Sequence, residues 1–182
     1  MEHIGVDKAN EPQGNARVLF ISTMAFSLGF AIWGMFSALA PFLIEWYHFT
    51  STQVLVLAAM EPLFAAAISI PLGIWSDQFG GRTVFTVLLV CLSVVLIFGT
   101  FAEGYYSFLF LGSMLGLGGA TFVVGNAPVS SWDPKSKQGM ALGLFALGNV
   151  GITIGMMVVT FVITSLADAS DPEGWRIIFS LF

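Results

Sequence analysis

The stretch GLGGATFVVGNAPVSSWDPKSKQGMALGLFALGNVGITIG, residues 116–155, consists of two glycine-rich apolar segments joined by one short charged connector. Glycine destabilises the interior of a soluble helix by roughly 1 kcal/mol relative to alanine, so these segments do not suit a soluble helix pair. In a lipid bilayer, small residues four positions apart allow helix backbones to pack closely. That spacing recurs in this part of the chain, at Gly112 and Gly116, at Gly139 and Gly143, and at Gly151 and Gly155.

We therefore expect two membrane-spanning helices that press their glycine faces against each other. Polar side chains within a bilayer form hydrogen bonds between helices. Four polar residues of this stretch would be held between the two helices: Thr121, Asn126, Asn149 and Thr153.

The composition of the whole chain indicates an integral membrane protein. Of its 182 residues 57% are hydrophobic and only 9% are charged, with a mean hydropathy of +0.89, whereas soluble domains carry about 25% charged residues. The six lysines and arginines form no basic cluster, which argues against a nucleic-acid partner. His3, His48 and Cys91 are isolated, and no nucleophile set or phosphate-binding loop occurs. We expect no enzyme activity, no cofactor and no metal site.

Apolar runs long enough to span a bilayer define the domain organisation. A spanning helix needs about 20 mostly apolar residues, and such runs lie at 18–44, 53–75, 83–101, 105–128 and 139–166. A sixth run, 175–182, is too short for a span. Residues 1–16 are a polar tail, and residues 17–182 are expected to form an all-α, polytopic bundle of five full spans plus the start of a sixth. The first run is too long for a signal peptide, so we expect it to remain uncleaved.

Lysine and arginine positions predict the orientation of the bundle. They precede the first run and occupy the links after the second and fourth runs: Lys8, Arg17, Arg82, Lys135 and Lys137. The alternate connectors, 45–52, 102–104 and 167–174, contain acids instead, and only Arg176 breaks the pattern. Because positively charged loops stay inside, the N-terminus is expected to be cytoplasmic, in a multi-pass protein of the plasma or inner membrane.

The second run ends in GIWSDQFGGR, residues 73–82. Gly73 would allow close packing, Asp77 would lie at the cytoplasmic edge, Gly80 and Gly81 would form a tight turn, and Arg82 would start the next helix. This segment resembles the signature between helices two and three of the major facilitator superfamily. It departs from that signature at two positions, Gln78 and Gly81, where basic residues are common. On its own the segment would also suit an ordinary loop with a capping aspartate.

Three stretches together resemble the nitrate/nitrite porter family of that superfamily: RVLFISTMAFSLGFAIWGMFSALAP at 17–41, IPLGIWSDQFGGR at 70–82, and the glycine-rich segment at 116–151. The resemblance implies a twelve-helix fold of two six-helix halves, of which this chain would be an incomplete N-terminal half. It also implies a substrate site near the membrane midplane. The partners would then be membrane lipid, the C-terminal half of the transporter and a small-molecule or ion substrate.

The resemblance implies substrate-binding roles for residues on the fourth and fifth runs. Asn149, in LGNVG, matches an asparagine near the substrate, and Gly148 would let an anion approach the backbone. Gly119 and Phe122, in GGATF, match a glycine and an aromatic ring that flanks a flat anion. Taken singly, Phe122 would more often be core packing and Asn149 an interhelical hydrogen bond.

One position departs from the porter family in a way that affects the substrate. The family has an arginine in helix two where this chain has Ser69, in AISIPLG. Ser69 can donate one hydrogen bond, but it cannot supply the charge or the forked geometry of a guanidinium group. A bare anion in a low-dielectric site costs several kcal/mol without a charged partner. The charge would come from the other half, or the substrate is not nitrate.

Glu61, next to Pro62, is the acid that lies well inside a predicted span, about 13 Å from its outer end. Ionisable residues inside membranes are rare and are usually functional. The carboxylate would suit proton coupling or a cationic group, and it lies close to the helical face of Ser69. The alternative is that Glu61 faces an outer vestibule and Pro62 simply kinks the helix.

Asp133, in SSWDPKSK, lies in the cytoplasmic connector on the side of Asp77 and Arg82. We expect these three residues to form an ionic cluster that latches the inner face in one transport state. The alternative is a solvated loop that contains Pro134.

These observations favour a secondary transporter that moves nitrate, nitrite or a similar small anion by alternating access. One alternative is a major facilitator transporter for a different small solute, organic or cationic, which Ser69 and Glu61 favour. A second alternative is a non-transporting membrane scaffold that uses its glycine faces to bind a partner.

Overall fold

Long apolar helices make up the part of the chain that the computed structural model describes, residues 15–132, 135–166, 176 and 178–182. Five of them are long and apolar enough to cross a membrane: Ala16–Tyr47, Ser51–Phe79, Gly81–Gly99, Gly104–Ser130 and Gln138–Ser165. The predicted all-α bundle of five spans and the start of a sixth is confirmed.

The first two spans are the helices α1 (Ala16–Tyr47) and α2 (Ser51–Phe79). The Asn15 side chain caps α1 by accepting a hydrogen bond from the Arg17 amide at 3.0 Å. Thr50 and Gln53 cap α2 reciprocally, which satisfies amides that have no partner within the first turn. Because these caps lie just before the apolar runs, both helices begin two residues before the predicted spans.

Glycines set the turns around the third span. Helix α3 (Gly81–Gly99) follows α2 directly, and Gly80 between them has φ +82°. Gly104, with φ +73°, opens the fourth span. A side chain would be strained at either φ value, so the predicted tight turn depends on Gly80.

The fourth and fifth spans each contain an interruption. The fourth consists of α4 (Gly104–Leu115) and α5 (Leu117–Trp132), which meet at Gly116. The fifth consists of α6 (Gln138–Ala146), the 3₁₀ turn η2 (Leu147–Asn149) and α7 (Val150–Leu166). At the cytoplasmic end of these spans, as the sequence predicts it, Gln138 Nε2 donates to the Ser130 carbonyl at 3.0 Å. The last element is the short helix α8 (Ile178–Leu181).

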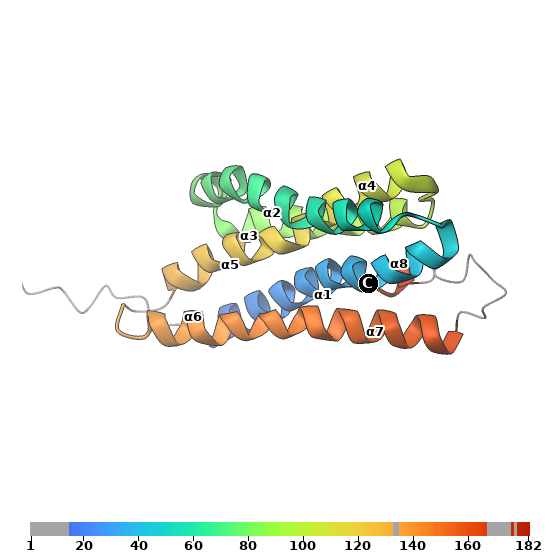
Figure 1. Ribbon diagram of the computed structural model, residues 1–182. Coiled ribbons are helices and arrows are strands. Elements are labelled where there is room, and N and C mark those ends of the chain that lie inside the picture. The colour runs from blue at the N-terminus through green and yellow to red at the C-terminus, as the bar shows by residue number, and fades with distance from the viewer. Residues whose placement is uncertain (1–14, 133–134, 167–175, 177) are drawn as a thin grey trace, which may run out of the picture.

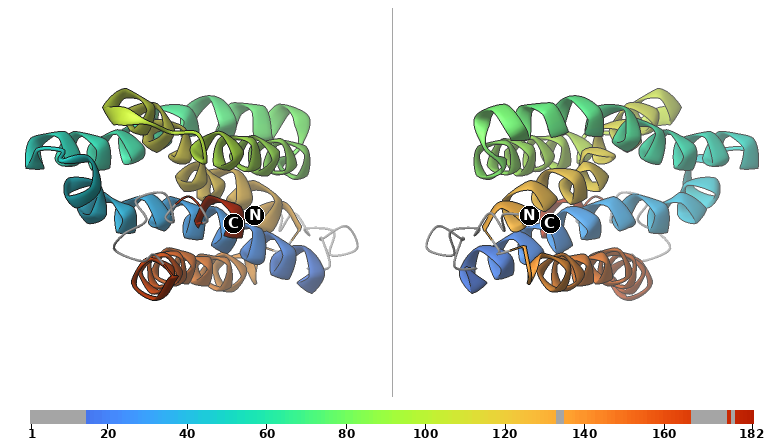
Figure 2. Two further views of the ribbon diagram at one scale, coloured as in Figure 1. Left: turned by 90° about the vertical axis from the view of Figure 1, so that its right-hand side faces the viewer. Right: turned by 90° about the vertical axis from the view of Figure 1, so that its left-hand side faces the viewer.

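Helix α1 lies between the fourth and fifth spans. Figure 1 shows α6 and α7 on one side of α1, with α5 and then α2, α3 and α4 on the other, and the end views of Figure 2 show the same layers. The most extensive helix contacts are those of α1 with α7 and of α1 with α5. The prediction that the fourth and fifth spans press mainly against each other is therefore wrong.

The glycine faces are closely packed, but against α1. A Cβ atom on Gly151 would collide with the Ser27 carbonyl, and one on Gly155 would collide with the Ala31 carbonyl. On the α1 side of the same contact, a Cβ on Gly34 would lie 2.6 Å from the backbone carbonyl oxygen of Ile152 in α7. Glycine spacing identifies a surface that permits close approach without identifying its partner, which explains the error.

The polar residues that were expected between the two spans have separate environments. Thr121 is fully buried, donates to the Gly118 carbonyl at 2.6 Å and contacts Gly29 of α1. Asn126 is half-buried, whereas Asn149 and Thr153 are exposed. The bundle therefore encloses one of these four side chains completely.

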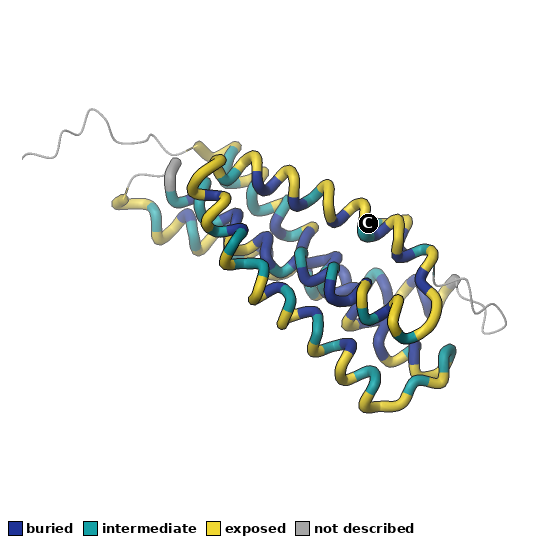
Figure 3. Tube along the Cα trace, turned by 90° about the horizontal axis from the view of Figure 1, so that it is seen from above, coloured by how far each residue is buried: buried dark blue, intermediate teal, exposed yellow. Residues whose placement is uncertain are grey.

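Exposed apolar side chains cover much of the outer surface. Figure 3 shows buried positions where helices face one another and exposed positions along their outward sides. Many of the exposed residues are large and apolar, including Phe20, Leu55, Ile70, Phe101 and Phe161. A surface of this kind is stable in lipid and unfavourable in water.

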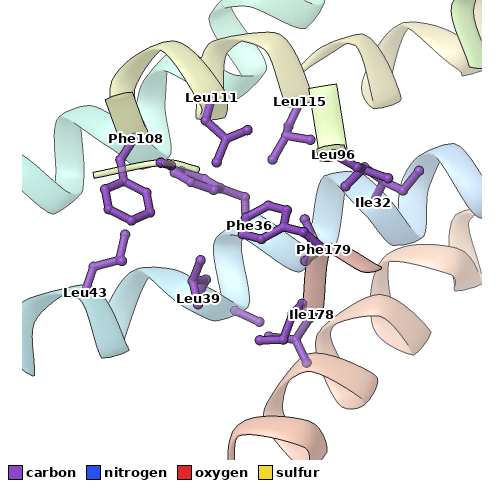
Figure 4. Packing of buried hydrophobic residues seen from close by; sticks show 14 of the residues in the cluster. Ile32, Phe36, Leu39, Leu43, Leu96, Phe108, Leu111, Leu115, Ile178 and Phe179 are labelled. Atoms are coloured by element: carbon purple, nitrogen blue, oxygen red, sulfur yellow. The ribbon is translucent and has the colours of Figure 1, made fainter. Parts of the chain in front are cut away.

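One buried cluster draws residues from α1, α2, α3, α4, α7 and α8. Figure 4 shows Phe36 and Leu39 of α1 pointing toward Leu111 and Leu115 of α4, with Phe179 of α8 beside them. The short helix α8 is thus part of the core. Gly99 allows this contact, because a Cβ there would lie 2.6 Å from the Phe179 ring.

Arg176, which breaks the predicted charge pattern, has an acidic partner. Its guanidinium group donates to Glu103 Oε1 at 3.1 Å, and Glu103 lies in the connector before α4. An exposed pair of this kind contributes about 0–1 kcal/mol. It neutralises the arginine on the side that is predicted to face away from the cytoplasm.

Gly151→Ala should destabilise the protein, because its methyl group would meet the Ser27 backbone of α1. We expect a loss of about 1–3 kcal/mol, the usual cost of overpacking, measured as a lower midpoint of thermal unfolding in detergent. Gly143→Ala is the matched control, because nothing lies within 4 Å of its Cβ position. Equal midpoints for the two variants would contradict the packing described here.

Candidate functional site

Three aromatic rings from three helices form what we call the aromatic cluster: Phe26 of α1, Phe122 of α5 and Phe145 of α6. The ring centroids of Phe26 and Phe145 are 4.7 Å apart and stacked, and Phe122 lies 5.4 Å from Phe26 and 6.0 Å from Phe145. Phe26 and Phe145 are fully buried, whereas Phe122 is 37% exposed. Phe122 is thus the accessible member of the cluster.

Two glycines lie against rings of the aromatic cluster, at positions where a side chain would collide with them. A Cβ on Gly148 would collide with the Phe26 ring, and one on Gly125 would lie 2.5 Å from the Phe145 ring. The structure therefore brings Phe122 and Gly148, predicted from separate segments, to the same Phe26 ring. The Cβ side of Gly148 is occupied by that ring, and an anion could approach its backbone only from another direction.

Asn149 ends the 3₁₀ turn η2 and is exposed. Its side-chain amide donates to the Ala146 carbonyl at 2.9 Å, within its own helical span. A primary amide has two N–H groups and one carbonyl oxygen, so a second donor remains. Within the described part of the chain, Asn149 makes no interhelical hydrogen bond, which was the alternative interpretation.

Gly119 is packed on its Cβ side. A Cβ there would lie 3.0 Å from the Ala65 methyl group and 3.6 Å from the Trp33 ring. Gly119 therefore lets α5 approach α2 and α1, which is a packing role. Its predicted role beside a substrate is not tested by this contact.

Glu61 and Ala65 of α2 lie against the junction of α4 and α5. Glu61 and Ala65 contact Gly116, Ala65 also contacts Gly119, and Ser69 Oγ donates to the Ala65 carbonyl at 2.6 Å. Ser69 has thus given its single proton to its own helix, so no hydroxyl hydrogen remains for an anion. The expectation that Glu61 and Ser69 lie on one helical face stays a prediction.

Glu61 is an enclosed carboxyl group. The residue is 1% exposed, Ser37 Oγ of α1 donates to its Oε2 at 3.3 Å, and its Oε1 has no hydrogen-bond partner among the described residues. This burial contradicts the alternative of an open outer vestibule. Sequence reasoning missed Ser37, because nothing in its local sequence indicates a contact 24 positions along the chain.

At the other end of α2, the GIWSDQFGGR segment is only partly packed. Gly81 lies against Pro128, where a Cβ would be 2.5 Å from the proline ring. Ser76 is 3% exposed and its hydroxyl has no partner among the described residues. Gly73, expected to allow close packing, makes no close approach, since a Cβ there would lie an ordinary 3.7 Å from Val123. Its small size is therefore not required by the contact observed.

The expected ionic latch is not formed by the residues that the structure describes. Asp77 and Arg82 are both exposed, and no ion pair joins them. Asp133 lies outside the described residues. The latch stays a prediction about another state of the protein.

A shallow groove of about 430 Å³ lies elsewhere, on the C-terminal half of α7. It is lined by Met156, Met157, Thr160, Phe161 and Thr164. All of these residues belong to one helix, and none belongs to the aromatic cluster or to the Glu61 site.

Together, the five apolar spans and the glycine-dependent packing define a multi-pass, all-helical membrane protein. The family model described as Major Facilitator Superfamily matches residues 19–182. The chain therefore belongs to the Major Facilitator Superfamily.

Several relatives carry names that refer to nitrate. "Probable nitrate/nitrite antiporter NarK1" of Thermus thermophilus is 33% identical over 187 residues, which covers 100% of this chain and 42% of the relative. "Probable nitrate transporter NarT" of Staphylococcus carnosus (strain TM300) is 24% identical, covering 95% of this chain and 44% of the relative. The protein of that name from Staphylococcus aureus (strain JH9) is 26% identical, covering 90% and 42%.

These comparisons confirm the resemblance to the nitrate/nitrite porter family within the superfamily. They also show that the chain spans less than half the length of the relatives it matches.

Gly148→Ala should disturb the aromatic cluster, because its methyl group would push on the buried Phe26 ring. We expect a lower midpoint of thermal unfolding, by about 1–3 kcal/mol in stability, and partial rescue when Phe26→Leu is added. Gly139→Ala is the control, since its Cβ position is open. If the second substitution brings no rescue, the contact between Gly148 and Phe26 is not the cause.

Proposed function

We propose that the full-length protein moves nitrate, nitrite or a similar small anion across the membrane by alternating access. In this mechanism the bundle rocks against a second helical bundle around a central site. The observation that carries the proposal is the family match over residues 19–182, together with the nitrate transporters among the relatives. The relatives are transporters, and binding and release would be the chemistry rather than a catalysed reaction.

The exposed edge of the aromatic cluster is our candidate for the anion contact. Phe122 offers an accessible ring to the plane of a flat anion, and Asn149 retains one amide hydrogen for an in-plane oxygen. Gly148 and Gly119 would serve by packing, which keeps Phe26 and α5 in place. Ser69 would not donate a hydrogen bond to the anion and would only help to shape the site, because its hydroxyl already donates to the Ala65 carbonyl.

The positive charge for an anion would have to come from outside this chain. Its lysines and arginines fall at 8, 17, 82, 135, 137 and 176, near the ends of the spans or in the connectors. An anion that leaves water without a charged partner is unstable by several kcal/mol. In the proposed mechanism, the second bundle supplies this partner.

A second candidate function is transport of a different small solute, organic or cationic. It is favoured by Ser69, where the porter family has an arginine, and by the buried Glu61. A carboxyl group within a span would attract a cation and repel an anion. The two candidates differ in the charge of the solute, which a transport assay distinguishes directly.

We also propose an orientation with the N-terminus in the cytoplasm of a plasma or inner membrane, based on the distribution of lysine and arginine. The links after α2 and α5 would then face the cytoplasm. In the inward-closed state, Asp77, Arg82 and Asp133 would form the ionic latch.

Phe122→Ala and Asn149→Ala should each weaken nitrate transport by the full-length protein in proteoliposomes. A hydrogen bond to a charged group contributes about 1.5–3 kcal/mol, so we expect the KM of Asn149→Ala to rise roughly 10- to 100-fold. Phe161→Ala, on the exposed face of α7, is the control and should leave KM unchanged. Uptake of an organic cation but not of nitrate by the unmodified protein would overturn the anion proposal.

Asp77→Asn should loosen the cytoplasmic latch and open the inner face. In a background in which the exposed Cys91 is replaced by serine, a cysteine introduced at the half-buried Ser130 should react faster with an impermeant thiol reagent. The control is Glu45→Gln, because Glu45 lies near the C-terminal end of α1, away from the end of α2 that carries Asp77. An unchanged rate of reaction in Asp77→Asn would count against the latch.

A further inference from the structure

The Glu61 carboxyl group lies at the junction of three spans. Its side chain reaches Ser37 of α1, and its backbone carbonyl packs against Gly116, where α4 ends and α5 begins. A side chain at Gly116 would collide with that carbonyl and approach the Ala65 amide to 3.1 Å. A change in the contacts of Glu61 would therefore affect the packing of the first, second and fourth spans together.

Only one of the two oxygen atoms of the Glu61 carboxyl group has a hydrogen-bond partner among the described residues. Oε2 accepts a hydrogen bond from Ser37, whereas Oε1 is buried without a partner among the described residues. Buried polar atoms in native proteins are usually hydrogen-bonded, and an exception calls for an explanation such as a missing ion or a functional role. Here the missing partner of Oε1 would have to be a hydrogen-bond donor, a proton or a cation.

Pro62 leaves a backbone acceptor without its helical donor in the preceding turn of α2. Proline has no amide hydrogen, so the Ala58 carbonyl lacks the donor that an uninterrupted helix would give it. A neutral carboxylic acid has an O–H donor, but a carboxylate only accepts. A proton on Oε1 would convert this unpaired acceptor into a hydrogen-bond donor.

No cationic side chain satisfies Glu61 within the described part of the chain. The elements packed against α2 are α1, α3, α4 and α5. Their described titratable groups, together with that of α2 itself, are Arg17, Glu45, Tyr47, Asp77, Arg82, Cys91, Tyr105 and Tyr106, and α5 contributes none. None of them forms an ion pair with Glu61.

We propose that Glu61 and Ser37 form a proton-binding site that couples proton movement to transport. The proton binds Oε1 and leaves from the same atom, with no covalent bond to the substrate. Ser37 itself is exposed on α1, and its hydrogen bond to Oε2 is partly buried, so the buried carboxyl group is held by a residue at the surface of the bundle. The protonated state fits the closed junction described here, and the charged state favours its opening toward water.

This inference rests on the proposed transport function, and it adds a coupling ion to it. A neutral Glu61 no longer repels an anion in the same bundle, whereas a charged one does. Proton and anion would therefore bind together and be released together, as in symport.

The test uses the full-length protein in proteoliposomes that contain a pH-sensitive dye. We expect nitrate entry to acidify the interior in the unmodified protein. In Glu61→Gln we expect loss of this acidification and exchange of nitrate at a rate independent of pH. Ser37→Ala should shift the pH dependence, and Glu45→Gln, exposed on α1, should behave as the unmodified protein. Acidification per nitrate that is unchanged in Glu61→Gln, or a requirement for sodium instead of protons, would overturn the coupling role.

A second measurement does not depend on the substrate. Infrared difference spectra between acidic and alkaline buffer should show the carbonyl stretch of a buried neutral carboxylic acid, and Glu61→Gln should lose that band. If nitrate is not transported but the band is present and lost in Glu61→Gln, the proposed substrate fails and the proton site stands. If the band is the same in both proteins, the proton site fails whatever the substrate is.

Discussion

The close approach of α1 to the glycine faces of α5 and α7 is the constraint on which the rest of the bundle depends. Gly151 and Gly155 meet backbone carbonyls of α1, Gly118 meets the Gly29 carbonyl, and Gly34 meets Ile152. In a bilayer, an apolar side chain gains little free energy by moving from lipid to a helix interface, because both are apolar. Helices therefore associate through close van der Waals packing. Small residues at these points bring whole backbones together, and α1 becomes the central helix of the five spans.

This central position of α1 also builds the candidate sites. Phe26 of α1 fills the space beside Gly148 and joins Phe122 to Phe145, and Ser37 of the same helix reaches Glu61. Other polar side chains satisfy themselves locally, as Ser69 does with Ala65 and Asn149 with Ala146. Glu61 and Ser76 are buried with unpaired oxygen atoms, and Glu61 carries a functional proposal because its side chain can ionise.

Sequence reasoning succeeded where one residue type has one physical consequence. Long apolar runs predicted the spans, and the positive φ of Gly80 agrees with the turn predicted after α2. It failed where a residue permits several outcomes. Glycine at 116, 151 and 155 predicted close contact, but the partner was α2 or α1 and not the neighbouring span. Gly73, assigned to the same role, makes no close contact.

The sequence by itself determined that the chain is a multi-pass helical membrane protein of the major facilitator type, because length, hydropathy and local motifs are properties of single segments. Only the tertiary structure decided that α1 separates the fourth and fifth spans, that Phe26 occupies the space beside Gly148, and that Ser37 holds Glu61. The physical reason is that hydropathy does not distinguish a side chain that faces lipid from one that faces another helix. Burial, and with it the meaning of each polar residue, follows from which helices meet.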